Sequence, residues 1–185
     1  SYNIGLLAAI KETIDISRAA QVPANVSHIK ALGVDVWGQS EAVIDQIEQA
    51  RVEGLLITAD QYPFEASSTS LSAALVPNWV FADIEDYRLR FDDSALLPRI
   101  KQEMAENLRR RGGPKAILLI AAADSTLDGK TLEAIADMNQ MEAVETAIEV
   151  LKNGGSAIAS FNMQESDIQN FMRQPWVMTS SDGGS

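Results

Sequence analysis

The sequence predicts an α/β fold with parallel strands, and three observations favour this prediction. The first third of the chain alternates between stretches with a helical spacing of apolar residues and short strand-like stretches. The strand predicted at 55–59 is apolar except for Thr58, and such a continuous run is typical of a strand with helices on both faces. Polar residues follow the predicted strands where their apolar runs stop, as they do around the ligand sites of α/β sheets and barrels.

Helix-breaking and helix-capping residues delimit the elements of the first third. Pro23 ends an amphipathic stretch, and Gly54 is well placed to follow the last residue of a helix. Ser40 is a suitable N-cap for the helix between them. The predicted elements are a helix at 4–20, a strand at 24–28, a loop at 31–39, a helix at 40–52 and a strand at 55–59.

The pattern changes after Pro63, where Ser, Thr and Ala become frequent. Thr131 is a predicted N-cap, and Asn162 with Glu165 resembles a capping box. The basic run at 109–111 ends a predicted helix, where it favours the negative end of the helix dipole. The remaining predictions are helices at 92–111, 132–138, 142–152 and 162–173, and strands at 116–122, 156–161 and 176–179.

These elements predict an unequal division of the chain. Residues 1–77 are expected to form βα units of a barrel, and residues 174–185 its last strand and a catalytic loop. Between them, residues 78–173 are expected to be an inserted, mostly helical α/β segment. About three barrel-type strands cannot close an eight-stranded (β/α)₈ barrel, so we expect the chain to be an excerpt of a larger protein.

Composition narrows the function classes. The chain has 185 residues and a net charge of −11, with its acidic residues spread along the sequence. This charge argues against binding to nucleic acid or to an anionic membrane surface. Cysteine is absent, so neither disulfides nor thiolate metal ligands can come from these residues. No membrane span or signal peptide is visible, and we expect a cytoplasmic protein of undetermined oligomeric state.

Four side chains near predicted strand ends are candidates for chemistry. Each has a simpler interpretation when it is taken alone. His28, the only histidine, is as a single residue more often a hydrogen-bonded structural group than a metal ligand. Lys30 can be a solvated charge, Tyr62 a ring packed beside a proline, and Asp182 a turn residue before glycines.

Taken together, the four residues indicate a catalytic site. All fall at the C-terminal ends of predicted strands, so in a barrel they would converge on one mouth. A histidine and an aspartate there can hold a metal ion and take a proton from its bound water, while a lysine and a tyrosine can hold a substrate carboxylate. The combination suits metal-assisted hydrolysis of an amide that carries a carboxylate.

Five motifs make the sequence similar to a known family, the N-acyl-D-amino-acid deacylases (D-aminoacylases) of the amidohydrolase superfamily. The motifs occur in the family's order and at compatible spacing, and the resemblance covers nearly the whole chain. They are VSHIKALG at 26–33, WGQS at 37–40, TADQYPFEAS at 58–67, LDGKTLEAIA at 127–136 and FMRQPWVMTSSDGG at 171–184. The resemblance implies a metal-dependent hydrolase (β/α)₈ TIM barrel, here strands six to eight, with a segment inserted between the last two strands.

The resemblance also implies roles for the four residues. His28 matches the zinc ligand of the sixth strand, and Asp182 matches the general base and acid of the eighth. Lys30 and Tyr62 match positions that bind the substrate carboxylate or polarise the scissile carbonyl, and the tyrosine match is the looser one. The family's other metal ligands would precede Ser1. They are a His-x-His pair, a cysteine and a fifth-strand histidine, so the chain alone is expected to be inactive.

The leading hypothesis is therefore a fragment of a zinc-dependent enzyme that hydrolyses N-acyl-D-amino acids, small-molecule substrates, to a carboxylate and a D-amino acid. Another amidohydrolase activity, on cyclic amides or on dipeptides with a D-residue, is the alternative among enzymes. A non-catalytic binding or assembly module is the alternative outside enzymes.

Overall fold

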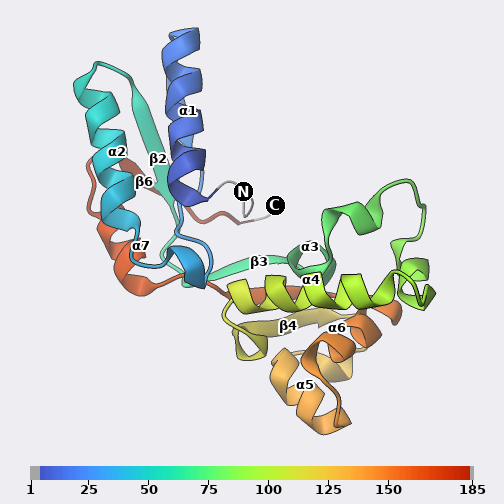
Figure 1. Ribbon diagram of the computed structural model, residues 1–185. Coiled ribbons are helices and arrows are strands. Elements are labelled where there is room, and N and C mark those ends of the chain that lie inside the picture. The colour runs from blue at the N-terminus through green and yellow to red at the C-terminus, as the bar shows by residue number, and fades with distance from the viewer. Residues whose placement is uncertain (1–4, 184–185) are drawn as a thin grey trace. The chain divides into compact units, whose positions relative to one another are not determined.

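The computed structural model describes residues 5–183, which form two compact units (Figure 1). Residue 4, where the first helix was predicted to begin, and Gly184 of the last motif lie outside that range. One unit contains the chain up to Glu65 together with the part from Met163 onward, and the other contains Ala66–Asn162. No helix within the described range is both long and apolar enough to cross a membrane.

The first unit is a parallel sheet with helices on one face. Its three strands lie in the order β1-β2-β6, and both pairs are parallel. Its elements are α1 (Leu6–Ala20), β1 (Ala24–Val26), η1 (Val34–Val36), α2 (Ser40–Val52), β2 (Ile57–Gln61), α7 (Glu165–Met172) and β6 (Val177–Thr179). The predicted α/β class with parallel strands is thus confirmed for this unit.

Side-chain alternation gives the sheet two different faces. Ile57 and Ala59 of β2 are fully buried in a cluster with apolar residues of α1, α2 and α7. The opposite face carries Asn25 paired in register with Thr58, and Asp60 paired with Met178. Asn25 and Met178 are exposed, so the polar face of this sheet is open within the described residues.

The N-terminus of α2 receives its cap from a distant residue rather than from Ser40. Ser40 is already helical, and the predicted cap is therefore wrong. Instead the buried carboxylate of Asp167 accepts hydrogen bonds from Gly38 N at 2.8 Å and from Ser40 N at 3.1 Å. The Asp167 carboxylate thus satisfies N–H groups that a local cap would otherwise bind. Gly54, in contrast, follows α2 with a φ of 93°, as predicted.

The second unit is an antiparallel sheet with helices over one face. The strand order is β3-β5-β4, and both pairs are antiparallel. Its elements are β3 (Ala66–Ser70), α3 (Leu71–Leu75), η2 (Asn78–Phe81), η3 (Tyr87–Asp92), α4 (Leu97–Arg110), η4 (Pro114–Ala116), β4 (Ile117–Ala122), η5 (Ser125–Leu127), α5 (Leu132–Asn139), α6 (Ala143–Lys152) and β5 (Ser156–Phe161). Thr131 Oγ1 accepts a hydrogen bond from Ala134 N and caps α5, as predicted.

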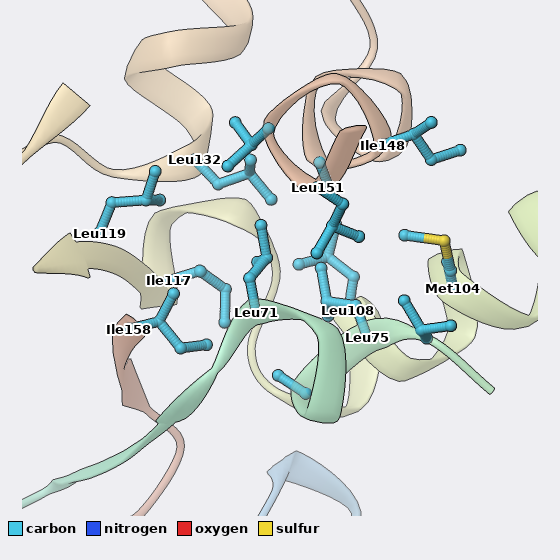
Figure 2. Packing of buried hydrophobic residues seen from close by; sticks show 14 of the residues in the cluster. Leu71, Leu75, Met104, Leu108, Ile117, Leu119, Leu132, Ile148, Leu151 and Ile158 are labelled. Carbon is cyan, nitrogen blue, oxygen red and sulfur yellow. The ribbon is translucent and has the colours of Figure 1, made fainter. Parts of the chain in front are cut away.

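The core of the second unit lies between its sheet and its helices (Figure 2). Ile117 and Leu119 of β4 and Ile158 of β5 point into this core and are fully buried. The helices contribute Leu71, Leu75, Met104, Leu108, Leu132, Ile148 and Leu151 among others. Because the two units have separate clusters of buried apolar residues, each has its own core.

The observed division differs from the predicted segments, which ended at residues 77 and 173. β3 was not predicted, and it pairs with β5, so the chain joins the second unit already at Ala66. α7 packs on α2, so the chain has returned to the first unit before this helix begins. Ala66–Asn162 is rich in helix, but its strands also form a three-stranded sheet.

Buried polar contacts correct one local prediction and extend another. Asn162 does not cap α7, whose N-cap is Gln164. Its buried side chain hydrogen-bonds Ser67 Oγ instead. The basic run does end a helix, as predicted, because Arg109 and Arg110 lie in the last turn of α4 and Arg111 is its C-cap. The side chain of Arg111 is also buried, and its guanidinium donates to Ala74 O and Ser160 Oγ, each at 3.2 Å.

Candidate functional site

The carboxyl ends of the three parallel strands define the candidate site. β1 ends at Val26, β2 at Gln61 and β6 at Thr179. Because the strands are parallel, the loops that follow them leave from the same edge of the sheet. His28, Lys30, Tyr62 and Asp182 all lie in these loops, so the structure places the four predicted residues at one edge.

Lys30, Tyr62 and Asp182 form a connected group. Lys30 Nζ donates a hydrogen bond to Tyr62 Oη at 3.0 Å and lies 4.0 Å from Asp182 Oδ2. Tyr62 is buried at 3% exposure, whereas the side chain of Asp182 is 46% exposed. Since Tyr62 Oη accepts a bond from Lys30, its own proton is directed elsewhere, and the pair offers two donors for an anion.

Burial sets the protonation of this group. It lowers the pKa of the Lys30 ammonium, against the opposing attraction of Asp182 and Asp60. Burial, together with the negative charge of Asp182, raises the pKa of the Tyr62 phenol to about 12. The phenol therefore stays neutral at physiological pH and keeps the proton that it can donate.

The raised pKa of Tyr62 predicts a specific titration. In a ¹³C NMR titration of the tyrosine ring carbons, the Tyr62 signal should remain that of a neutral phenol at pH 11. Its folded pKa of about 12 exceeds the usual 10.0. The free energy of unfolding should therefore fall as the pH rises from 10 to 12, because only the unfolded state ionises there. Tyr62→Phe should remove this dependence. Ionisation of Tyr62 near pH 10 would contradict the prediction.

His28 lies in a turn beyond the strand rather than at its end. The predicted strand at 24–28 is therefore too long, because the chain turns after Val26 and His28 adopts a φ of 41°. Its backbone N donates to Asp60 Oδ1 at 2.8 Å. Within residues 5–183 no hydrogen bond or ion pair joins the exposed His28 ring to Lys30, Tyr62 or Asp182.

A metal ion needs more ligands than this part of the chain offers. Among the described residues, no three His, Cys, Asp or Glu side chains lie close enough to hold a metal ion. Zinc sites in proteins use three or four such ligands. The described residues therefore do not form a zinc site by themselves.

Asp60 is a site residue that the sequence analysis missed. Besides His28 N, its carboxylate accepts hydrogen bonds from Ser180 Oγ at 3.1 Å and Asn25 Nδ2 at 2.9 Å. Burial raises the pKa of Asp60, but these hydrogen bonds outweigh it and hold the pKa below its usual value. The available signal was its place in the sequence, because Asp60 directly follows the strand predicted at 55–59.

Comparisons with known proteins found relatives in sequence and in structure. No family model matches the chain. Over 64 residues the chain is 34% identical to the N-acyl-D-glutamate deacylase of Alcaligenes xylosoxydans xylosoxydans. This aligned stretch is 35% of the present chain and 13% of that protein. The chain therefore spans a small part of the length of this curated relative.

Two solved structures share the fold. The N-acyl-D-glutamate deacylase of Bordetella bronchiseptica, complexed with zinc and a phosphonate inhibitor, matches with a TM-score of 0.67 at 23% identity, over 96% of this chain and 30% of that one. A D-aminoacylase described as defining a novel subset of amidohydrolases matches with a TM-score of 0.62 at 24% identity, over 95% and 29%. The resemblance to N-acyl-D-amino-acid deacylases, predicted from the motifs, is confirmed by the curated relative over 64 residues, and the two solved structures show the shared fold over a part of their length.

Proposed function

We propose that this chain is part of a zinc-dependent amidohydrolase that hydrolyses the amide bond of N-acyl-D-amino acids, releasing a carboxylate and a D-amino acid. The observation that carries the proposal is the contact of Lys30 with both Tyr62 and Asp182 at the carboxyl edge of the parallel sheet. It combines donors for a substrate carboxylate with a carboxylate suited to proton transfer.

Asp182 is the proposed proton carrier. Its exposed carboxylate can take a proton from the attacking water and then donate a proton to the leaving nitrogen. Lys30 and Tyr62 are the proposed binding residues for the substrate carboxylate. The ammonium supplies the charge, and the neutral phenol supplies a directed hydrogen bond.

His28 is the proposed zinc ligand of this segment. The remaining ligands must come from outside the described residues, because these contain no complete metal site. When it is bound, zinc activates water and polarises the amide carbonyl. We therefore expect the 185-residue chain alone to show no turnover.

The parallel sheet of the first unit supports a place in a (β/α)₈ barrel. Helices cover one of its faces, while its other face carries Asn25, Thr58 and Asp60 and is open. Parallel sheets are normally covered on both faces, and β1 and β6 are edge strands here. We propose that β1, β2 and β6 are the sixth to eighth barrel strands and that Ala66–Asn162 is the inserted segment between the last two.

The direct test is hydrolysis of matched N-acetyl-D- and N-acetyl-L-amino acids by the zinc-loaded full-length protein. Strong preference for the D-isomer is expected. Turnover of neither isomer, with zinc bound, would contradict the proposed substrate class, and activity on a cyclic ureide or a D-residue dipeptide would then identify a different amidohydrolase. A full-length protein that binds no stoichiometric zinc would instead favour a non-catalytic module. Its cytoplasmic location remains part of the proposal.

Lys30→Ala is expected to raise KM in the full-length enzyme by about 10-fold or more, because a hydrogen bond to a charged group contributes about 1.5–3 kcal/mol. The substitution should change kcat less, since Lys30 is proposed to hold a part of the substrate that does not react. Steady-state kinetics measure both constants. Lys11→Ala, which removes an exposed lysine on α1, is the control, and an unchanged KM for Lys30→Ala would reject the carboxylate role.

A further inference from the structure

Asp60 occupies a central place in the first unit. It lies on β2, the middle strand of the sheet, one residue before the strand ends. Its side chain is on the open face, opposite the buried Ile57 and Ala59. The loops after β1 and β6 leave the sheet on either side of it, and they carry His28 and Asp182 respectively.

The two carboxylate oxygens of Asp60 connect these neighbouring segments. Oδ1 accepts from both His28 N at 2.8 Å and Ser180 Oγ at 3.1 Å. Oδ2 accepts from Asn25 Nδ2 at 2.9 Å, and Asn25 in turn accepts from Thr58 Oγ1 at 2.9 Å. One acceptor atom thus joins a loop that follows β1 to a loop that follows β6.

The hydrogen bond from His28 N to Asp60 Oδ1 also stabilises an unfavourable backbone conformation of His28. His28 has a φ of 41°, in the left-handed region that few residues other than glycine adopt. Asp60 accepts two hydrogen bonds from this turn. His28 N donates to its carboxylate, and Ile29 N donates to its backbone O at 2.8 Å. The residue that holds this turn is therefore on the strand beside it.

We propose that Asp60 is a positioning residue that sets the loops of His28 and Asp182 relative to each other, and that it does so through hydrogen bonds rather than through its charge. This inference rests on the proposed function of those two residues. Lys30 and Tyr62 contact each other directly, so substrate binding should depend on Asp60 less than the proton-transfer step does.

Two substitutions separate geometry from charge. Asp60→Ala removes all three side-chain hydrogen bonds. Asp60→Asn removes the charge but keeps an acceptor oxygen for His28 N and Ser180 Oγ. Asp45→Asn is the matched control, since Asp45 is an exposed aspartate on α2. For each variant of the full-length enzyme, kcat, KM and zinc content are measured with an N-acetyl-D-amino acid.

Asp60→Ala is expected to lower kcat by about 100-fold with little change in KM, because small displacements of reacting groups have effects of that size. Asp60→Asn should recover most of the lost kcat, and Asp45→Asn should behave as the wild type. An undiminished kcat in Asp60→Ala would overturn the proposal, as would a loss in Asp60→Asn as large as that in Asp60→Ala. A raised KM at normal kcat would also overturn it, since it would assign Asp60 to substrate binding.

A second measurement does not depend on the reaction. In ¹H–¹⁵N NMR spectra of the 185-residue chain, Asp60→Ala should shift the amide signals of both His28 and Ser180, while Asp60→Asn should shift them much less. If the wild-type enzyme hydrolyses no N-acyl-D-amino acid, the proposed function fails, and these spectra still test the link between the loops. Unshifted His28 and Ser180 signals in Asp60→Ala would show that no such link exists.

Discussion

Asp182→Asn is expected to abolish amide hydrolysis by the full-length enzyme while leaving its zinc content nearly unchanged. General acid and base groups contribute up to about 10⁴-fold to a rate, and an amide can neither take up nor release the proton at the required step. We therefore expect kcat to fall by about 10⁴-fold. This is the largest effect predicted for any single side chain of the chain.

The local backbone makes asparagine a conservative substitution at this position. Asp182 adopts a φ of 47°, and asparagine tolerates this left-handed conformation as well as aspartate does. The loop should therefore keep its course, and Lys30 loses only a charge that lies 4.0 Å away. The loss of turnover would then report proton transfer rather than a displaced loop.

Metal analysis and steady-state kinetics on the same preparation provide the measurement. Asp137→Asn, at an exposed aspartate of α5 in the second unit, serves as the control and should retain full activity. Turnover by Asp182→Asn at the wild-type rate would remove Asp182 from the mechanism. Loss of zinc together with turnover would instead make Asp182 mainly a metal ligand.

Phe171→Ala is expected to lower the free energy of unfolding of the first unit by about 3–5 kcal/mol, the range measured for buried phenylalanine. Phe171 is fully buried on α7, in the cluster that contains Ile47 of α2 and Ile57 of β2. Its removal leaves a cavity between the helices and the sheet that carries the candidate site. Few domains can lose that much stability and remain fully folded.

Native-state hydrogen exchange can locate this loss. Amide protection should fall in β2, while β5 in the second unit should keep its protection, because the two units have separate cores. Leu119→Ala is the reciprocal variant. Leu119 is fully buried in the second core, so β5 rather than β2 should lose protection. Equal loss in both strands from either substitution would contradict independent cores.

Local sequence signals predicted most of the helices and strands. The helix at 40–52 and the strand at 156–161 occur at the predicted residues, because each has a clear apolar period and a glycine boundary: Gly54 follows the helix, and Gly154 and Gly155 precede the strand. β3 was missed because Ala66–Ser70 has no apolar face. It is an edge strand whose residues are partly or fully exposed, and its pairing with β5 depends on a distant segment.

The candidate site was predictable to the extent that its residues follow strands. The positions of Lys30, Tyr62 and Asp182 at one edge follow from parallel pairing, which the apolar runs already indicated. Asp60 was not predictable in the same way, because its role comes from hydrogen bonds to residues more than thirty positions away in each direction. The cap that Asp167 provides for α2 was not predictable either, because Asp167 is also distant in the sequence from the helix it caps.

The chain leaves the first unit and returns to it at adjacent points. Met163 N donates to Glu65 O at 3.1 Å, and just inside this contact Ala66 of β3 is paired with Phe161 of β5. A segment whose two ends meet in this way can be exchanged for another, or for a short turn, at little cost in loop-closure entropy. Ala66–Asn162 is therefore a segment that evolution or an engineer can replace while the parallel strands and the loops that follow them keep their structure.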